Sequence, residues 1–171
     1  MTVTIDDLRA ELTALRGRVA ELTDRAEISA LIDRYVTLLD TQDENGYDET
    51  WPPTVFTDDV LLHFPIGTHE GIDGVARFHY EAKARFDRTL HLSANHAIRL
   101  DGDRGTVRFH VVATHVHRRE AGEQGAPAAL FDIGGHYGGV VVRTSQGWRF
   151  KEWSFNLTWA DGPGPDGTPV L

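Results

Sequence analysis

Cysteine is absent from this sequence, and lysine occurs only twice, as Lys83 and Lys151. The absence of cysteine excludes disulfides, thiolate-bound zinc, iron–sulfur clusters and a cysteine nucleophile. Two lysines leave few candidates for Schiff-base chemistry, although neither is excluded. No apolar run approaches the roughly 20 residues that span a bilayer. The sequence also lacks the G-x-S-x-G signature of many serine hydrolases and the glycine spacing of phosphate-binding loops.

The charge balance is acidic, with 17 Lys and Arg against 26 Asp and Glu, and a net charge of −9. Such a surface repels phosphate backbones and anionic lipids, so we expect neither nucleic acid nor a membrane as a partner. The length of 171 residues and the 40% hydrophobic content favour a single folded domain, residues 1–160. The glycine- and proline-rich stretch 161–171 is predicted to be a flexible tail. Acids near the N-terminus, where a signal peptide has bases, predict a cytoplasmic protein.

The N-terminal half has the periodicity of helices. Apolar residues recur every three or four positions over residues 5–22, which predicts a helix with a narrow apolar seam. Asp24 followed by Glu27 has the pattern of a helix start, so a second helix is predicted from there to about Asp40. The remaining predicted elements of this half are a short helix over 51–56, a strand over 60–65, a loop over 67–74 and an amphipathic helix over 73–86.

The C-terminal half has the composition of long strands separated by turns. The predicted strands are 89–100, 106–119, 129–143 and 147–159. Helices followed by long antiparallel strands predict an α+β domain in which helices cover one face of a curved sheet. The glycines from Gly134 to Gly139 lie within a strand, where they favour sharp curvature of the sheet.

Three residues are candidates for proton transfer. Asp40 ends an apolar helix near the negative end of its dipole, where a carboxylate is a suitable partner for a histidine. His91 lies in a strand whose alternation places His91, Ser93 and Asn95 on one face, and imidazole titrates near neutral pH. Tyr35 lies on the buried stripe of its helix, where its hydroxyl needs a partner. A solvated Asp40, a structural His91 and a core Tyr35 are the alternatives.

Further residues are candidates for the wall of a pocket. His115 and His117 point to one face of a strand, but Glu120 follows too soon for the H-x-H-x₃₋₄-E pattern, so we expect no metal. Arg143 shares a strand face with Tyr137, and an inward guanidinium there would hold an anionic intermediate; a solvated strand end is the alternative. The predicted substrate contacts are His115, Arg143, Tyr137, Asn95, Trp51, Phe64, Trp153 and Phe155.

The order of these residues resembles the SnoaL-like branch of the nuclear transport factor 2-like superfamily, over roughly residues 20–160. The resemblance rests on Tyr35-x-x-x-x-Asp40, Trp51, Phe56-Thr-Asp-Asp-Val60, Gly71, His91-x-x-x-Asn95, Gly134-Gly-His-Tyr137, Arg143 and Gly147-Trp148-Arg-Phe150. It implies a cone-shaped, curved mixed β-sheet wrapped by about three helices, with an internal pocket. In the family's bile-acid 7α-dehydratases, scytalone dehydratases and hexachlorocyclohexane dehydrochlorinases, an Asp–His dyad performs elimination.

Carried over residue by residue, the resemblance places the dyad on Asp40 and His91, the dehydratases' tyrosine on Tyr35 and the dehydrochlorinases' arginine on Arg143. It implies a cofactor-free dehydratase (a lyase) that acts on a hydrophobic polycyclic or aromatic metabolite. An isomerase or a polyketide cyclase would use the same first step. A non-catalytic binding module, like the small subunit of ring-hydroxylating dioxygenases, is the alternative of another class. A homo-oligomer, dimer or trimer, is also implied.

Overall fold

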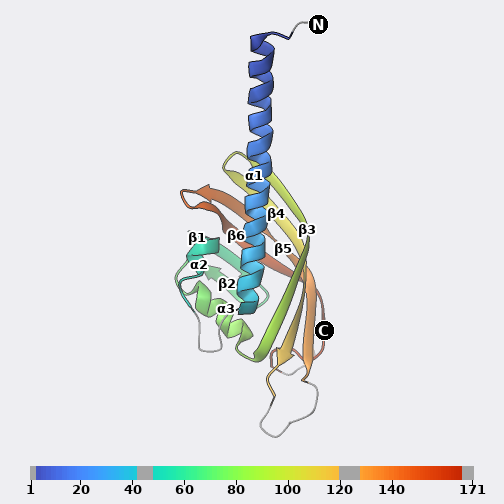
Figure 1. Cartoon of the computed structure of the whole chain (residues 1–171). Coiled ribbons are helices and arrows are strands. Elements are labelled where there is room, and N and C mark those ends of the chain that lie inside the picture. Colours follow the sequence, from blue (N-terminus) through green and yellow to red (C-terminus); the bar gives the residue numbers. More distant parts are fainter. Residues whose placement is uncertain (1–2, 42–47, 120–127, 167–171) are drawn as a thin grey trace.

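The computed structural model describes residues 3–41, 48–119 and 128–166. The chain forms three helices and a six-stranded sheet (Figure 1); two helices come before the first strand, and the third lies between the second and third strands. The helices are α1 (Ile5–Thr41), α2 (Pro52–Val55) and α3 (Val75–Lys83). The strands are β1 (Phe56–Phe64), β2 (Gly67–Glu70), β3 (Phe86–Asp101), β4 (Arg104–His117), β5 (Leu130–Thr144) and β6 (Gly147–Asp161). No helix of the described part is both long and apolar enough to cross a bilayer.

The strands form one curved sheet in the order β2-β1-β6-β5-β4-β3. β1 runs parallel to β6, and the other neighbours are antiparallel, so the sheet is mixed, as expected. Figure 1 shows α1 crossing the sheet, with α3 near the C-terminal end of α1 and β3 curving around it. The predicted α+β class and the long C-terminal strands are confirmed. The predicted loop 67–74 was partly wrong, because β2 pairs its first four residues with the end of β1.

α1 is one continuous helix of 37 residues, so the predicted break before Asp24 was wrong. Its start is a reciprocal cap: the Asp7 amide donates to the Thr4 hydroxyl at 3.2 Å, and the Asp7 carboxylate accepts from the Thr4 amide at 2.9 Å. Asp24 lies inside the helix, and its carboxylate pairs with Arg143 at 2.5 Å instead of capping helical amides. The ion pair with Arg143, and not a helix cap, therefore accounts for an acid at position 24.

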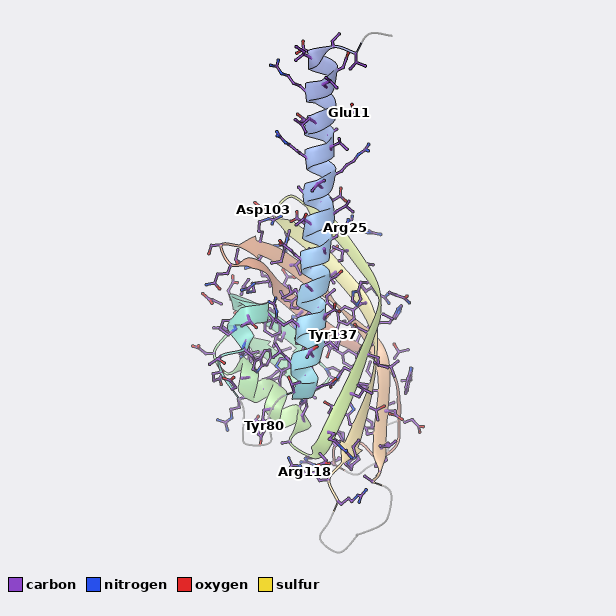
Figure 2. The ribbon with its side chains drawn as sticks, in the orientation of Figure 1. Glu11, Arg25, Tyr80, Asp103, Arg118 and Tyr137 are labelled. Atoms are coloured by element: carbon purple, nitrogen blue, oxygen red, sulfur yellow. The ribbon has the colours of Figure 1, made fainter. Side chains whose placement is uncertain are left out.

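The two halves of α1 have different surroundings. Every residue from 3 to 23 is exposed, and Figure 2 shows this half, which carries Glu11, standing clear of the domain. The second half is amphipathic and buries one stripe in the core. Its buried residues are Ile28, Leu31, Ile32, Tyr35, Val36 and Leu39. Where the halves meet, Arg25 donates to the Ile98 carbonyl of β3 at 2.6 Å, which fixes the helix against the sheet edge.

Glycines let β5 and β6 approach each other closely. A Cβ built on Gly139 would lie 1.8 Å from the Glu152 carbonyl oxygen, and one on Gly134 would lie 2.1 Å from the Trp159 ring. The register of this strand pair shifts beside both glycines, where the ladder gains a bulge. The predicted link between the glycines and sheet curvature agrees with this geometry, because bulges bend a sheet.

An aromatic cluster fills the core between α1 and the sheet. The Tyr35 ring makes edge contacts with Phe56, Phe150 and Trp153, with ring centroids 5.7, 5.8 and 5.9 Å apart. Phe150 and Trp153 stack at 3.9 Å. Edge-to-face and offset pairs of this kind add stability beyond burial alone. The cluster closes one end of the space under the sheet, and the other end remains hollow.

Candidate acid–base pocket

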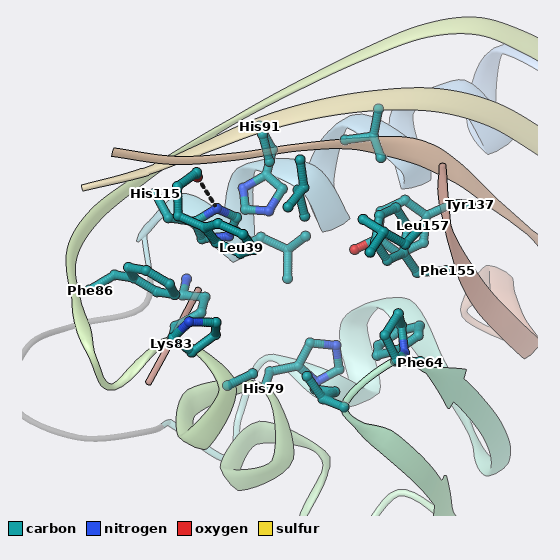
Figure 3. A pocket seen from close by; sticks show the side chains of 18 residues that line it. Leu39, Phe64, His79, Lys83, Phe86, His91, His115, Tyr137, Phe155 and Leu157 are labelled. Carbon is teal, nitrogen blue, oxygen red and sulfur yellow. Dashed lines mark hydrogen bonds between the residues drawn. The ribbon is translucent and has the colours of Figure 1, made fainter. Parts of the chain in front are cut away.

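A cavity of about 270 Å³ lies between α3, the C-terminal end of α1 and the inner face of the sheet. Figure 3 shows His91 and His79 on opposite sides of it, with Lys83 and Phe86 toward one end and Tyr137 and Phe155 toward the other. Its lining residues are Leu39, Phe64, Pro65, Ile66, His79, Ala82, Lys83, Phe86, His91, Val111, Ala113, His115, Phe131, Ile133, Tyr137, Phe155, Leu157 and Pro165. Few of these side chains are polar, as is usual for a site that takes a small hydrophobic molecule.

His91 lines this cavity, and Asp40, which is not among the lining residues, contacts the His91 side chain directly. Oδ1 of Asp40 lies 2.6 Å from Nδ1 of His91, and Oδ2 accepts the His91 backbone N–H at 2.9 Å. The Thr89 hydroxyl donates to Oδ1 at 2.9 Å. The last turn of α1 brings the carboxylate to β3, where strand alternation turns Thr89 and His91 inward. The side chain of Asp40 is 21% exposed and that of His91 is 7% exposed, so the pair is largely shielded from water.

The hydrogen bonds decide the charge of Asp40. Burial raises its pKa, but the donors of His91 and Thr89 outweigh burial, and the pKa lies below the ordinary value of 3.8. Asp40 is therefore a carboxylate at neutral pH and accepts the proton of His91 Nδ1. A neutral His91 then has its lone pair on Nε2, the ring nitrogen that Asp40 leaves free beside the cavity. This tautomer is the one that a general base requires.

His115 forms part of the same wall, as predicted from its strand face. Its Nδ1 donates to the Phe131 carbonyl at 3.1 Å, and its ring centroid lies 5.6 Å from that of His91. Burial, with a smaller contribution from the neighbouring His91, lowers the pKa of His115 to about 4. His115 is therefore neutral at physiological pH, and its Nε2 is an acceptor. In this state it has no proton to donate to an oxyanion.

Tyr35 does not line the cavity, although it was predicted as a catalytic residue. It is fully buried, and its hydroxyl donates to Nε2 of His79 at 3.2 Å. His79 in turn donates from Nδ1 to the Val75 carbonyl at 2.9 Å, and burial lowers its pKa to about 4. Burial raises the pKa of Tyr137 to about 12, and its hydroxyl contacts Tyr35. The hydroxyl of Tyr35 is thus committed to the core.

Two residues of α3 that line the cavity, His79 and Lys83, were not among the predicted pocket residues. Burial lowers the pKa of Lys83 to about 8, while Asp40 opposes this shift. The signal was available, because His79 and Lys83 follow the apolar Val75 at i+4 and i+8 in the predicted amphipathic helix, and residues at these spacings share a face.

Asn95 lies outside the pocket, on the exposed side of β3. The pairing of β3 with β4 shifts register between Ala94 and Ala97, and Asn95 adopts a positive φ of 58°. Because this bulge adds a residue, the alternation predicted from His91 through Asn95 was wrong beyond Ser93. His96 takes the inward position instead and contacts Phe109, with ring centroids 5.3 Å apart.

Three other predicted contacts also lie away from the cavity. Arg143 is at the opposite end of β5, where it pairs with Asp24 at 2.5 Å and Asp103 at 2.9 Å and covers the Trp148 ring. Trp51 and Trp153 are buried in the aromatic cluster. Arg143 shares a strand face with the buried Val141, but β5 extends past the core at this end, so the arginine side chain reaches these two acids instead of the cavity. Of the predicted contacts, His115, Tyr137, Phe64 and Phe155 do line the cavity.

The described part of the predicted tail packs at the mouth of the pocket. Pro165 lines the cavity, and His117 contacts the Pro163 carbonyl at 2.8 Å. Residues 167–171 of that tail, and Glu120 of the rejected metal pattern, lie outside the described residues. Among the residues that the structure does describe, no cluster of three or more His, Asp or Glu side chains is arranged to hold a metal.

These features define a small α+β domain whose curved mixed sheet encloses an apolar pocket with an Asp–His pair in its wall. The sequence profile of the SnoaL-like domain matches residues 20–154, so the chain belongs to the SnoaL-like family. No curated protein sequence is significantly similar to it.

Solved structures confirm the fold. A putative scytalone dehydratase from Novosphingobium aromaticivorans is 20% identical, with a TM-score of 0.69, over 88% of this chain and 91% of that one. A hexachlorocyclohexane dehydrochlorinase is 17% identical, with a TM-score of 0.70, over 85% and 92%. A nuclear transport factor 2-like protein from Salmonella enterica is 21% identical, with a TM-score of 0.67, over 81% and 94%. At these identities the likeness establishes the fold alone, and the predicted nuclear transport factor 2-like fold is confirmed.

Proposed function

We propose that this protein is a cofactor-independent acid–base enzyme, a dehydratase-type lyase that acts on a hydrophobic cyclic molecule. The observation that supports this most is the 2.6 Å contact between Asp40 and His91 in the wall of an apolar cavity. Of the solved structures with a similar fold, one is named a putative scytalone dehydratase and another a hexachlorocyclohexane dehydrochlorinase, and both names describe lyase-type activities. Enzymes of this kind need a positioned base and exclusion of water, and both are present here.

The chemistry follows from the tautomer of His91. Nε2 removes a proton from the carbon next to a carbonyl, and the C–H electron pair moves into an enolate. The enolate re-forms the carbonyl and expels a hydroxyl from the adjacent carbon with its bonding pair. The imidazolium, stabilised by Asp40, returns its proton to that departing hydroxide, so the products are an unsaturated carbonyl compound and water. Isomerisation or ring closure would begin with the same proton removal and remains the second possibility.

Two observations bear on the alternative of a non-catalytic module. A separation of more than about 5 Å between Asp40 and His91 would have ruled out direct proton transfer, and the distance is 2.6 Å. A cavity filled by Trp153 and Phe155 would have left no room for a substrate. Trp153 is in the core, and Phe155 forms a wall of the open cavity. Both observations favour an enzyme.

The first step can be tested without knowing the physiological reaction. Cyclic ketones and β-hydroxy ketones of one to three rings are incubated with the protein in D₂O, and deuterium uptake next to the carbonyl is followed by NMR. We expect His91→Ala to lower the exchange rate by about a hundredfold or more, and Asp40→Asn to lower it as well. His110→Ala is the matched control, because His110 lies on the exposed face of β4.

The products then separate the possibilities. Loss of one water with a new conjugated absorbance supports a dehydratase, an unchanged mass with a shifted double bond supports an isomerase, and a new ring supports a cyclase. Exchange that is equally fast in wild type, His91→Ala and Asp40→Asn would reject the acid–base role of the pair. Co-purification with a Rieske-type large subunit, without exchange on any ketone, would favour the non-catalytic module.

A further inference from the structure

Lys83 is the one cation among the described residues that line the cavity, and the lining contains no carboxylate. This composition is unusual for a chain with a net charge of −9. Lys83 ends α3, and Figure 3 shows it at the cavity beside Phe86. The other lysine, Lys151, forms a surface ion pair with Asp59. None of the ion pairs between described residues includes Lys83, whose side chain is half-buried.

The histidines of the lining have already used their Nδ1 protons. The Nδ1 protons of His79, His91 and His115 go to the Val75 carbonyl, Asp40 and the Phe131 carbonyl. The hydroxyl of Tyr137 contacts that of Tyr35. Asp40 is the carboxylate that Lys83 senses, but both of its oxygens are occupied by His91 and Thr89. Lys83 is thus the one charged hydrogen-bond donor among the described side chains of the lining.

We propose that the ligand of this pocket carries an anionic oxygen, such as a carboxylate, phenolate or enolate, which the Lys83 ammonium holds while the apolar walls enclose the ring system. An ammonium that is half removed from water gains most from a charged acceptor, since such hydrogen bonds are the strong ones. The proposal rests on the proposed function and deepens it by naming the substrate class. A cyclic acid, or a ketone whose enolate is the reaction intermediate, meets this description.

The size of the cavity limits the ring system. An apolar cavity of about 150 Å³ holds one benzene ring, so the 270 Å³ found here fits one or two fused rings with a polar substituent. We therefore choose 2-naphthoate as the anionic probe and 2-naphthamide as its neutral isostere. Neither probe has a C–H on the carbon next to its carbonyl, so no enolate can form and binding is measured without turnover.

The experiment compares the dissociation constants of both probes by titration calorimetry for wild type, Lys83→Met and Lys151→Met. Methionine keeps an apolar stem and removes the charge. We expect wild type to bind naphthoate at least about tenfold more tightly than naphthamide, Lys83→Met to lose this preference without weaker amide binding, and Lys151→Met to keep it.

A wild type that binds neither probe or binds both equally, or a preference that survives Lys83→Met, would overturn the proposal. Circular dichroism checks that each variant is folded. The binding comparison is independent of catalysis. Deuterium exchange that is as rapid in His91→Ala as in wild type would reject the acid–base function and leave the binding result unchanged. Conversely, equal binding of the two probes would leave the deuterium-exchange result intact.

The exposed half of α1 carries a second, independent inference. Its apolar residues follow the alternating three- and four-residue spacing of coiled-coil positions a and d, and each is between 47% and 70% exposed. Positions a are Ile5, Leu12 and Val19, and positions d are Leu8, Leu15 and Leu22. β-branched residues at most a positions with leucine at d favour two parallel strands. Most helical stability in proteins comes from packing of an apolar face, so a partner on this exposed seam would stabilise the helix.

The charges beside the seam agree with a second copy of the chain in parallel orientation. In this register Glu11 occupies position g, and Arg16 occupies the following position e. In a parallel dimer these two positions face each other across the interface, so Glu11 of each copy meets Arg16 of the other. We infer that residues 5–22 of two copies form a short parallel coiled coil, which accounts for the expected homo-oligomer.

Sedimentation equilibrium over a concentration series tests this association on the full chain. We expect a dimer for wild type, a monomer for Leu12→Glu, and a dimer for the control Ala10→Glu on the opposite helix face. The chain has no cysteine, so Leu8→Cys reports the orientation: a parallel pair places the two thiols together and gives a disulfide dimer on oxidation. In an antiparallel pair centred on the seam they are roughly 16 Å apart.

Several outcomes would overturn this inference. A monomeric or trimeric wild type excludes the two-stranded pair. A dimer that persists in Leu12→Glu places the interface elsewhere. A Leu8→Cys variant that dimerises without forming the disulfide excludes the parallel orientation.

Discussion

Asp40→Asn is the perturbation whose effect on stability the geometry defines best. Asp40 accepts three hydrogen bonds, from the ring and the amide of His91 and from the hydroxyl of Thr89. The asparagine amide has one oxygen, so its NH₂ group must face one of these donors, and a donor is left unpaired. An unpaired buried donor costs about 1–3 kcal/mol. Because the Asp40 side chain is 21% exposed, water partly compensates, and we expect a loss of about 2 kcal/mol.

The pH dependence of this loss follows from the lowered pKa of Asp40. In the unfolded chain the carboxyl titrates near 3.8, and in the folded protein it titrates below that value. The stabilisation is therefore complete above about pH 3.8 and disappears as the pH falls through the folded pKa. Urea titrations followed by tryptophan fluorescence at pH 7, 5 and 3 measure the difference between wild type and variant.

The control and the refuting result are equally direct. Asp59→Asn removes an exposed acid that pairs with Lys151, and it should change stability little at any of these pH values. Equal stability of Asp40→Asn and wild type at pH 7, or a difference that grows in acid, would show that the three hydrogen bonds do not hold Asp40 as a carboxylate.

Three further substitutions test other parts of the structure. Gly139→Ala should destabilise the fold by about 3 kcal/mol, because the added Cβ would overlap the Glu152 carbonyl; an unchanged urea midpoint would contradict the close approach of β5 and β6. Gly17→Ala meets no neighbour within 4 Å and should stabilise the helix by about 1 kcal/mol, seen as slower amide exchange around residue 17. Tyr35→Phe leaves Nε2 of His79 without its donor and should cost about 1–2 kcal/mol in urea unfolding, whereas naphthoate affinity should hold within about twofold.

The pocket was implied by the resemblance to the SnoaL-like family, whereas most of the elements were determined by the sequence alone. Local patterns were sufficient, because helical and strand periodicities record which faces are buried, and prolines and glycines mark where elements end. The same reasoning placed Asp40 at the end of a helix and turned His91 inward. Both features depend on the spacing within a single element, and that spacing is visible in the residues themselves.

The tertiary structure decided what those elements do to one another. The two predicted helices are one, and Asp24, which resembled a helix start, instead pairs with Arg143 of a strand more than a hundred residues away. The tertiary structure turned Asn95 outward by a bulge that no local pattern marks. It also brought Lys83 to the cavity with no acid beside it, since the one carboxylate in range is held by His91. Pairing, register and charge neutralisation depend on distant partners, so they follow from packing and could not be read from local sequence.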